Sequence, residues 1–421
     1  MEPQSLPEKD HTELSRTARF SALILYFAAM VTDGFDLAVM PLTMPAIARE
    51  WRLPDTQLFG AIFSAGILGI MVGAPLLGSI ADRLGRKRTF IFSLFFFGLC
   101  SLSVIYVNTV TQLFLARFGT GFGIGGALSL GIVSSAELVR PTLRTRVIAI
   151  VSTGATAGVA LAGFAASWLL PLAGWRSLFI MGAVAPIMVG VLAIFVLPES
   201  ITRTDARSDI PIESAVKTEA RKRAFELFSG SLAYMTPLLW LLFIVVGLTN
   251  YFIQSWVPTL YSAEGYLMAD VALALGLFGG FGAVGGLLIG WPVDRFGVRA
   301  VTFLFILAIP VLAILASSHP SRAVLMALMA AAGLLLYSLQ VAINGIATQL
   351  YPAGMRAKGV GWGLGSVRMG QLLGASGGGL LIGTGMGMGP LFWLLTSLAI
   401  VGALASIPLG RCFAERYASG D

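Results

Sequence analysis

The stretch GSIADRLGRKR at residues 78–88 returns in altered form as GWPVDRFGVRA at residues 290–300, 212 positions later. The same offset aligns ELVRPTLRTR (137–146) with QLYPAGMRAK (349–358). Two separate matches at one offset are hard to obtain by chance. They indicate a duplicated unit in which each copy carries the motif G-x-x-x-D-R-x-G.

The composition is that of a polytopic membrane protein. Of the 421 residues, 57% are hydrophobic and 12% are charged, whereas soluble proteins carry about 25% charged residues. A helix needs about 20 apolar residues to cross a bilayer. Windows of that length give twelve candidate spans: 20–41, 58–80, 89–107, 111–133, 147–171, 175–197, 238–261, 271–292, 300–317, 321–345, 359–384 and 388–410. We therefore predict an all-α membrane protein with twelve transmembrane helices in two pseudo-symmetric six-helix bundles.

The distribution of Lys and Arg predicts the orientation. With the N-terminus inside, 22 of the 28 Lys and Arg fall in cytoplasmic segments and four in outer loops, and Arg117 and Arg368 lie within spans. Both termini are therefore expected in the cytoplasm. The expected units are a cytoplasmic tail, a first six-helix bundle, a cytoplasmic linker loop, a second six-helix bundle and a second cytoplasmic tail: 1–19, 20–197, 198–237, 238–410 and 411–421.

The repeated motif lies in a tight cytoplasmic turn between two spans. In the first copy Asp82 can pair with Arg83, with Arg86 or with a neighbouring helix end, and in the second copy Asp294 lies beside Arg295. Such a turn can latch one closed conformation and release it. The alternative is an anchor that only fixes orientation. The acidic residue favours the latch, because an anchor does not need one.

VTDGFDLAVMP (31–41) puts Asp33 and Asp36 inside the first apolar run. At spacing i,i+3 they share one helix face, and each ionised carboxylate at the bilayer centre costs roughly 2.5–3.5 kcal/mol. A carboxylate that keeps its proton until the pathway opens is a natural proton carrier. The alternative is a buried structural ion pair. Two acids on one face favour proton coupling or gating, whether they share that task or divide it.

Two arginines also lie within predicted spans. Arg117 lies about 9 Å from the outer end of the fourth span, at 1.5 Å per residue, and Arg368 lies near the middle of the eleventh. Arginine keeps its charge and needs an anionic partner. One possibility is static pairing, for example of Asp33 with Arg117. The other is a bidentate bond to a substrate carboxylate, which we favour for Arg368 and leave open for Arg117.

Polar and aromatic residues mark spans seven and ten. They are Asn250, Tyr251, Gln254 and Trp256 in NYFIQSWVP, and Tyr337, Gln340 and Asn344 at i, i+3 and i+7. Ring stacking and amide hydrogen bonds at these positions would suit an aromatic acid. Interhelical hydrogen bonds and interfacial belts are the alternative explanation.

The twelve spans, the six-six division and the doubled motif resemble the major facilitator superfamily. DGFDLAVMPLTMPAI (33–47), WVPTLYSAEGY (256–266) and LYPAGMRAKGVGWGLGSVRMG (350–370) are similar to the patterns of its aromatic acid:proton symporters. The resemblance implies proton-coupled uptake of a small aromatic carboxylate, of the 4-hydroxybenzoate, protocatechuate or benzoate type, by alternating access across the inner membrane.

The resemblance also implies roles for individual residues. It gives Arg117 a link to proton coupling and Arg356 a bracing role at the inner gate. It places an acid at Glu137, for which a cytoplasmic salt-bridge cluster with Arg140 and Arg144 is an equal alternative to a proton role.

Several function classes are not supported. The sequence has two histidines, His11 and His319, and shows no Ser/His/Asp set, no metal-ligand spacing and no phosphate-binding G-x-x-x-x-G-K-[ST] motif. We expect neither an enzyme nor a cofactor, and no nucleic acid binding. The expected partners are the small aromatic carboxylate substrate, protons and the lipid bilayer. We expect the protein to be a monomer. A symporter for a non-aromatic organic anion and a transporter-like receptor remain as alternatives.

Overall fold

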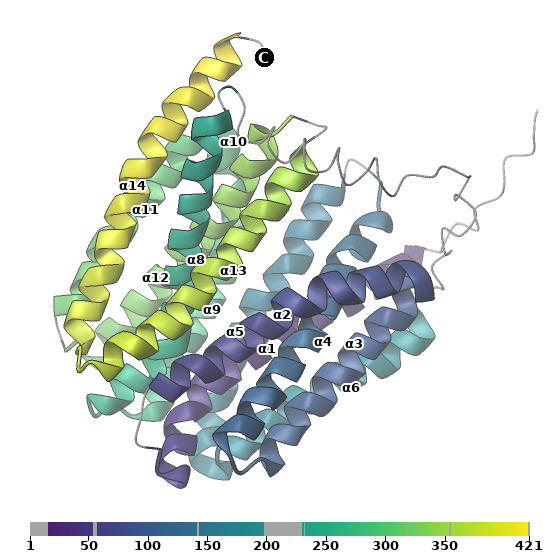
Figure 1. Ribbon diagram of the computed structural model, residues 1–421, viewed down its shortest axis with the longest axis vertical. Coiled ribbons are helices and arrows are strands. Elements are labelled where there is room, and N and C mark those ends of the chain that lie inside the picture. Colours follow the sequence, from purple (N-terminus) through teal and green to yellow (C-terminus); the bar gives the residue numbers. More distant parts are fainter. Residues whose placement is uncertain are drawn as a thin grey trace, which may run out of the picture.

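The computed structural model describes residues 16–53, 57–140, 143–197, 230, 232–317, 319–352 and 355–419, and these form helices and short connections with no strand. Most of the predicted tail 1–19 and linker 198–237 lies outside the described residues. The first half contains α1 (Arg16–Trp51), α2 (Gln57–Leu84), α3 (Arg86–Ser103), α4 (Val110–Glu137), α5 (Arg144–Ala173) and α6 (Trp175–Val196), with a 3-10 turn at Val104–Tyr106. The second half contains α8 (Leu232–Ala263), α9 (Met268–Leu288), α10 (Gly290–Phe296), α11 (Val298–Ser317), α12 (Arg322–Leu350), α13 (Arg356–Gly383) and α14 (Met388–Ser419). Figure 1 shows the two halves side by side.

Eleven helices of the described chain are long and apolar enough to cross a membrane, which confirms a multi-pass membrane protein. The eleventh predicted span, 359–384, coincides with α13, which has the length of a span but is not among those eleven helices. Its sequence holds ten glycines and three basic residues, and this composition lowers its hydropathy. It packs along α8 all the same.

The two copies of the motif lie at the same end of the molecule, which we call the motif end. The first copy closes α2, and Gly85 at φ 94° separates α2 from α3; the second forms α10, and Gly297 at φ 55° separates α10 from α11. Positive φ is accessible to glycine without a steric penalty. The last glycine of each motif copy is therefore the residue at which the chain turns. The second copy is a separate short helix because Pro292 has no N–H for the carbonyl of Leu288.

The internal repeat is visible in the packing. Gly121 of α4 abuts the carbonyl of Gly66 in α2, and 212 residues later Gly333 of α12 abuts the carbonyl of Phe278 in α9; a Cβ on either glycine would lie 2.0 Å from that oxygen. The helices α1 and α8 show the repeat at an offset of 213. Gly34 of α1 abuts the carbonyl of Ala155 in α5, and Gly247 of α8 abuts the carbonyl of Val367 in α13. Close backbone approach through glycine is a general solution for membrane helices.

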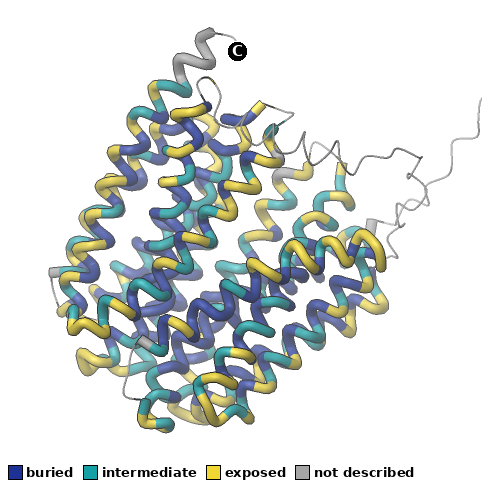
Figure 2. Tube along the Cα trace, viewed as in Figure 1, coloured by how far each residue is buried: buried dark blue, intermediate teal, exposed yellow. Residues whose placement is uncertain are grey.

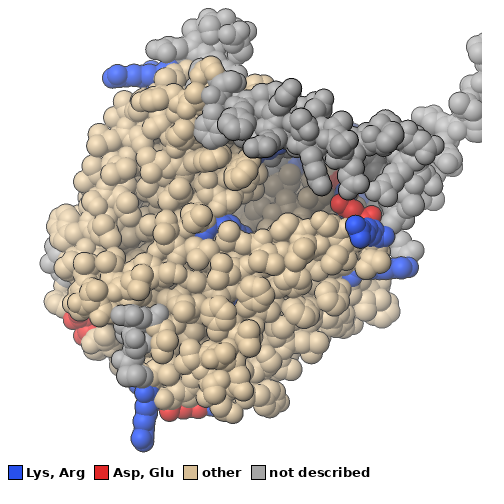
Figure 3. Space-filling view, viewed as in Figure 1, with Lys and Arg blue, Asp and Glu red and all other residues tan. Residues whose placement is uncertain are grey.

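The halves are joined away from the motif end and separated at it. In the joined region, a Cβ on Gly60 of α2 would lie 2.9 Å from the carbonyl of Ala375 in α13, and the hydroxyls of Ser64 and Ser376 share a hydrogen bond of 2.6 Å. Nearer the motif end of the same α13, a Cβ on Gly361 or Gly365 would meet nothing within 4 Å. Figure 3 shows the surface hollowed between the two halves.

The buried apolar residues follow the same division. One cluster joins both halves and includes Phe63 of α2 and Trp256 of α8. A second cluster, with Tyr26, Met30 and Phe90, belongs to the first half alone and lies toward its motif end. Figure 2 shows the buried positions concentrated where the halves meet. The structure is therefore closed at one end and open at the motif end.

Candidate functional site

The two acids of α1 lie on a helix face whose position is fixed by Gly34. A Cβ on this glycine would lie 1.7 Å from the carbonyl oxygen of Ala155 in α5, so α1 and α5 meet backbone to backbone. Asp33 and Asp36 flank the contact and are 4% and 1% exposed. The packing of α1 thus carries both carboxyl groups into the protein interior.

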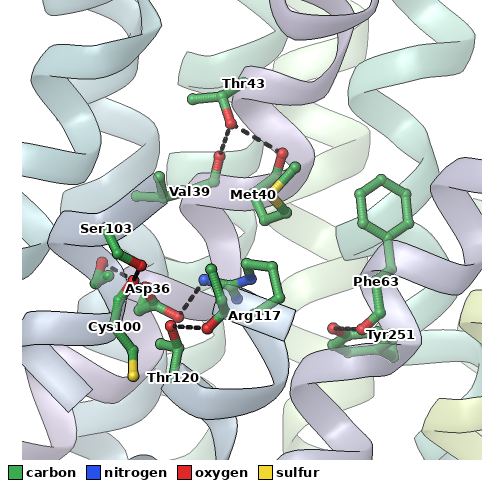
Figure 4. Close-up of polar contacts among 12 residues, drawn as sticks. Asp36, Val39, Met40, Thr43, Phe63, Cys100, Ser103, Arg117, Thr120 and Tyr251 are labelled. Atoms are coloured by element: carbon green, nitrogen blue, oxygen red, sulfur yellow. Dashed lines mark hydrogen bonds and ion pairs between the residues drawn. The ribbon is translucent and has the colours of Figure 1, made fainter. Parts of the chain in front are cut away.

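Asp36 belongs to a buried ion pair. Arg117 Nη1 of α4 lies 2.7 Å from Asp36 Oδ2, and Ser101 Oγ of α3 donates to Asp36 Oδ1 at 3.2 Å. Figure 4 shows the pair between α1 and α4. The sequence suggested Asp33 as an example of a partner for Arg117, and that was wrong, because the structure pairs Asp36. Both carboxylate oxygens of Asp36 are satisfied, and the two charges cancel.

Asp33 is in a different situation. Its Oδ1 is buried and has no hydrogen-bond partner among the described residues. The charges that act on it are an attractive one from Arg368, across the boundary between the halves, and a repulsive one from Asp36. A buried polar atom without a partner is costly, and a charged one more so. Asp33 is therefore the acid of the pair that gains most from a proton or a cation.

Arg368 lies on α13, opposite α1, and is half-buried. Its Nη1 donates to Oε1 of Gln371 at 2.9 Å. Within the described part of the chain no carboxylate lies within 4 Å of it, and its long-range attraction is to Asp33 and Tyr251. A guanidinium has five N–H donors, so Arg368 retains donors for an anion that enters from the open end.

The four charges break the internal repeat. The residues that occupy the equivalent positions of Asp33, Asp36, Arg117 and Arg368 in the other half are Val246, Thr249, Met329 and Thr156. At each of these positions, the half that lacks the charge makes the same glycine contacts as the half that carries it. The charges are thus not required by the fold, which favours a functional use.

The predicted aromatic residues of α8 contribute to the closure between the halves. The hydroxyl of Tyr251 donates to the carbonyl of Phe63 at 3.2 Å, as Figure 4 shows. The indole N–H of Trp256 donates to the carbonyls of Gly374 and Ala375, both at 3.1 Å, and its ring centroid lies 5.2 Å from that of Phe63. Trp256 is fully buried, so in this state it packs against α2 and α13.

The remaining polar residues of α8 and α12 are buried or half-buried. Asn250 donates to the carbonyl of Leu336 at 3.2 Å, Gln254 is 4% exposed, and Gln340 is half-buried. The Oδ1 atoms of Asn250 and Asn344 are buried without partners among the described residues. Tyr337 packs on Phe278, with ring centroids 5.3 Å apart.

At the motif end the predicted latch is not engaged. Asp82 and Asp294 are exposed and form no salt bridge within the described residues, and Arg83 is also exposed. Arg86 pairs with Glu137 of α4, so the sequence-based neighbours Arg140 and Arg144 are not the partners of that acid.

Two further arginines of the predicted latch have local contacts. Arg295 lies over the ring of Trp291. Arg356 donates to the carbonyl of Tyr351 at 3.5 Å. The exposed Asp82 and Asp294 in the two turns are consistent with a structure in which the halves are separated at this end.

Sequence reasoning missed three residues of this region. Ser101 donates a hydrogen bond to Asp36, Ser376 is hydrogen-bonded to Ser64 across the halves, and Gln371 accepts a hydrogen bond from Arg368. Gln371 carried a signal, because it follows Arg368 at i+3 on one helix face. The two serines carried none, since their partners lie on distant segments.

The sequence and the structure were compared with known proteins. Residues 25–316 match the Major Facilitator Superfamily. A gallate transporter of Pseudomonas putida is 32% identical, covering 92% of this chain and 91% of that protein. The 4-hydroxybenzoate transporter PcaK of Pseudomonas aeruginosa is 32% identical over 91% and 90% of the two chains.

Two solved structures share the fold. A bacterial homologue of the human lysosomal transporter Spinster, described as inward-facing and unoccupied, has a TM-score of 0.75 at 18% identity and covers 96% of this chain and 99% of its own. A D-xylose-proton symporter has a TM-score of 0.75 at 15% identity over 92% and 97% of the two chains.

Proposed function

The chain belongs to the major facilitator superfamily, and on that premise we propose that it takes up a small aromatic carboxylate together with a proton by alternating access. The relatives named for gallate and 4-hydroxybenzoate, and a benzoate transport protein of Acinetobacter baylyi at 27% identity, support an aromatic acid. The excess of Lys and Arg on one side supports an inner-membrane protein with cytoplasmic termini and a cytoplasmic linker between two six-helix bundles.

One observation carries the proposal: Asp33 has an unpartnered oxygen and faces Arg368 across the two halves. When Asp33 is ionised it attracts the guanidinium of Arg368 and competes with any other anion. When Asp33 takes a proton, Arg368 is free to bind a carboxylate through two parallel N–H···O bonds. The proton and the anion therefore bind together, which is the requirement for symport.

The two acids divide the work. Asp33 carries the proton, while Asp36 neutralises Arg117 and keeps it in place. Arg117 then acts through this pair rather than on the substrate. Tyr251 interacts electrostatically with Arg368 and Arg117, which supports its ring as a surface on which an aromatic substrate held by Arg368 would stack. The unpartnered oxygens of Asn250 and Asn344 accept from ring hydroxyls.

The open motif end corresponds to the inward-facing state. In the outward-facing state the contact between Ser64 and Ser376 opens and the motif turns approach each other. Asp82 and Asp294, which are exposed here, then find basic partners, and Arg356 braces the closed gate. Glu137 is paired with Arg86 and belongs to this latch.

The proposal is tested with purified protein in proteoliposomes. Labelled 4-hydroxybenzoate should accumulate when the exterior is acidic, and an uncoupler should abolish the accumulation. Asp33→Asn should lose accumulation but keep exchange of external for internal substrate, because it mimics the protonated acid. Arg368→Lys should raise KM about tenfold or more, since a point charge cannot replace the planar fork.

The control is Asp270→Asn, which removes an acid paired with Arg322 at the opposite end and should behave as wild type. Accumulation that persists with the uncoupler would exclude proton coupling. Unchanged kinetics in Arg368→Lys would exclude the proposed carboxylate site. A competition panel of aromatic and aliphatic acids decides the substrate class, because a guanidinium accepts either carboxylate and only the ring contacts favour the aromatic one.

A further inference from the structure

We propose that Gln371 is a positioning residue that holds the guanidinium of Arg368 on its own helix, away from Asp33, and thereby keeps it available for the substrate carboxylate. This inference rests on the proposed function of Arg368. It adds a residue that neither the sequence motifs nor the charges identified.

The first support is the hydrogen bond itself. A cation at this depth can be satisfied by an acid across the cavity or by a neutral acceptor on its own helix. The structure shows the second arrangement, since Arg368 Nη1 donates to Gln371 Oε1 at 2.9 Å. An amide oxygen orients the guanidinium without cancelling its charge, whereas a carboxylate would do both. Arg368 therefore keeps its full attraction for an incoming anion.

The second support is the rigid base on which the pair stands. Gly370 and Gly374 flank Gln371 and face α8, where a Cβ would lie 2.3 Å from the carbonyl of Ile244 and 2.7 Å from that of Leu248. These contacts fix the rotation of α13 at this level. The spacing i,i+3 then places Gln371 beside Arg368, one turn nearer the closed end.

The third support is the internal repeat. The equivalent of Gln371 in α5 is Val159, which is 3% exposed and packs in the core that joins the halves. Gly158 and Gly370 make equivalent contacts with α1 and α8, although Val159 is buried whereas Gln371 is half-buried. Packing at this position accepts an apolar side chain, and the amide therefore has another use.

The consequence is a competition that Gln371 biases. Without the amide, the guanidinium of Arg368 loses its local acceptor and turns to ionised Asp33, the acid that already attracts it. The substrate must then displace an ionised acid from Arg368. Binding weakens, and it weakens most where Asp33 is ionised, at high pH.

The test is a double-mutant cycle in proteoliposomes, with exchange of labelled 4-hydroxybenzoate as the readout, because exchange does not require Asp33 to release its proton. Gln371→Met should raise KM about tenfold, which corresponds to 1.4 kcal/mol of binding, with Vmax within about twofold. The loss should grow with pH. In the Asp33→Asn background Gln371→Met should have little effect on KM, because no acid remains to capture Arg368.

The conservative variant Gln371→Asn, which shortens the amide by one methylene, should give an intermediate KM and serves if the Met variant does not insert. Ser366→Ala on the same helix removes a hydroxyl bonded to the carbonyl of Trp362 and should match wild type. An unchanged KM in both Gln371 variants, or an equal loss in the Asp33→Asn background, overturns the inference. Normal transport by Arg368→Lys would instead overturn the proposed function.

Discussion

Asp36 and Arg117 are buried together in a region that gives neither charge access to water, with exposures of 1% and 3%. Both carboxylate oxygens of Asp36 are satisfied, since Ser101 donates to the second one, while Nε of Arg117 is buried without a partner among the described residues. Such pairs contribute little net stability, but the loss of one partner leaves an uncompensated buried charge. The pair is thus best tested through stability rather than through transport.

Arg117→Met alone should destabilise the protein by about 3–5 kcal/mol, because Asp36 is left charged and buried. The double variant Asp36→Thr/Arg117→Met introduces the residues of the equivalent positions, Thr249 and Met329, and should recover most of the loss. The measurement is the midpoint of thermal unfolding in detergent. A single variant as stable as wild type would contradict the ion pair.

Sequence reasoning recognised all four charged residues but not their pairing. Asp33 and Asp36 share one helix face, and Arg117 can be matched with either. The choice depends on the depth at which α4 crosses α1 and on the Ser101 hydroxyl from α3. These are tertiary facts with no local pattern. The charged residues were therefore predictable from their cost in a membrane, and the choice of Asp36 as the partner of Arg117 was not.

Among the helices, α2 and α13 form one of the contacts that join the two halves, and the proposed alternating access requires this contact to break. The hydroxyls of Ser64 and Ser376 lie 2.6 Å apart, a separation that two cysteine sulfurs can bridge, since a disulfide measures about 2.05 Å. The variant Ser64→Cys/Ser376→Cys should form a disulfide upon oxidation. Uptake should then stop, because the halves can no longer separate at this end, and a reductant should restore it.

Each single cysteine variant serves as the control and should transport normally under oxidation. Cys100 and Cys412 are free and are replaced in the background used. Full activity of the cross-linked protein would show that α2 and α13 stay joined during transport. In that case another pair of helices must open.

The elements themselves were largely predictable from hydropathy, because a bilayer requires continuous apolar helices. The glycine-rich α13 shows the limit of that signal. Its glycines allow close contact with α8, and the same glycines lower the mean hydropathy of the helix. The break between α9 and α10 follows from Pro292 in the second motif, which the sequence displayed but the prediction did not use.

At the scale of the molecule, the duplication was readable from one offset, and the structure reproduces it contact by contact. What the sequence could not supply is the state of the molecule. The proposed alternating access requires a second state, open at the other end, that differs from this one by a few kcal/mol. In the state described here, the contacts between the halves are made away from the motif end.

The completed pair of Asp36 and Arg117 also has an electrical consequence. With those two charges cancelled, a bound proton on Asp33 and a monovalent carboxylate on Arg368 add no net charge to the moving halves. A translocated elementary charge would be driven by about 2.3 kcal/mol per 100 mV. We therefore expect that a potential imposed with valinomycin and potassium leaves the initial uptake rate unchanged, while a pH gradient accelerates it. A rate that followed the voltage would require a second proton, and the cell could then use its membrane potential, not acidity alone, to concentrate the substrate.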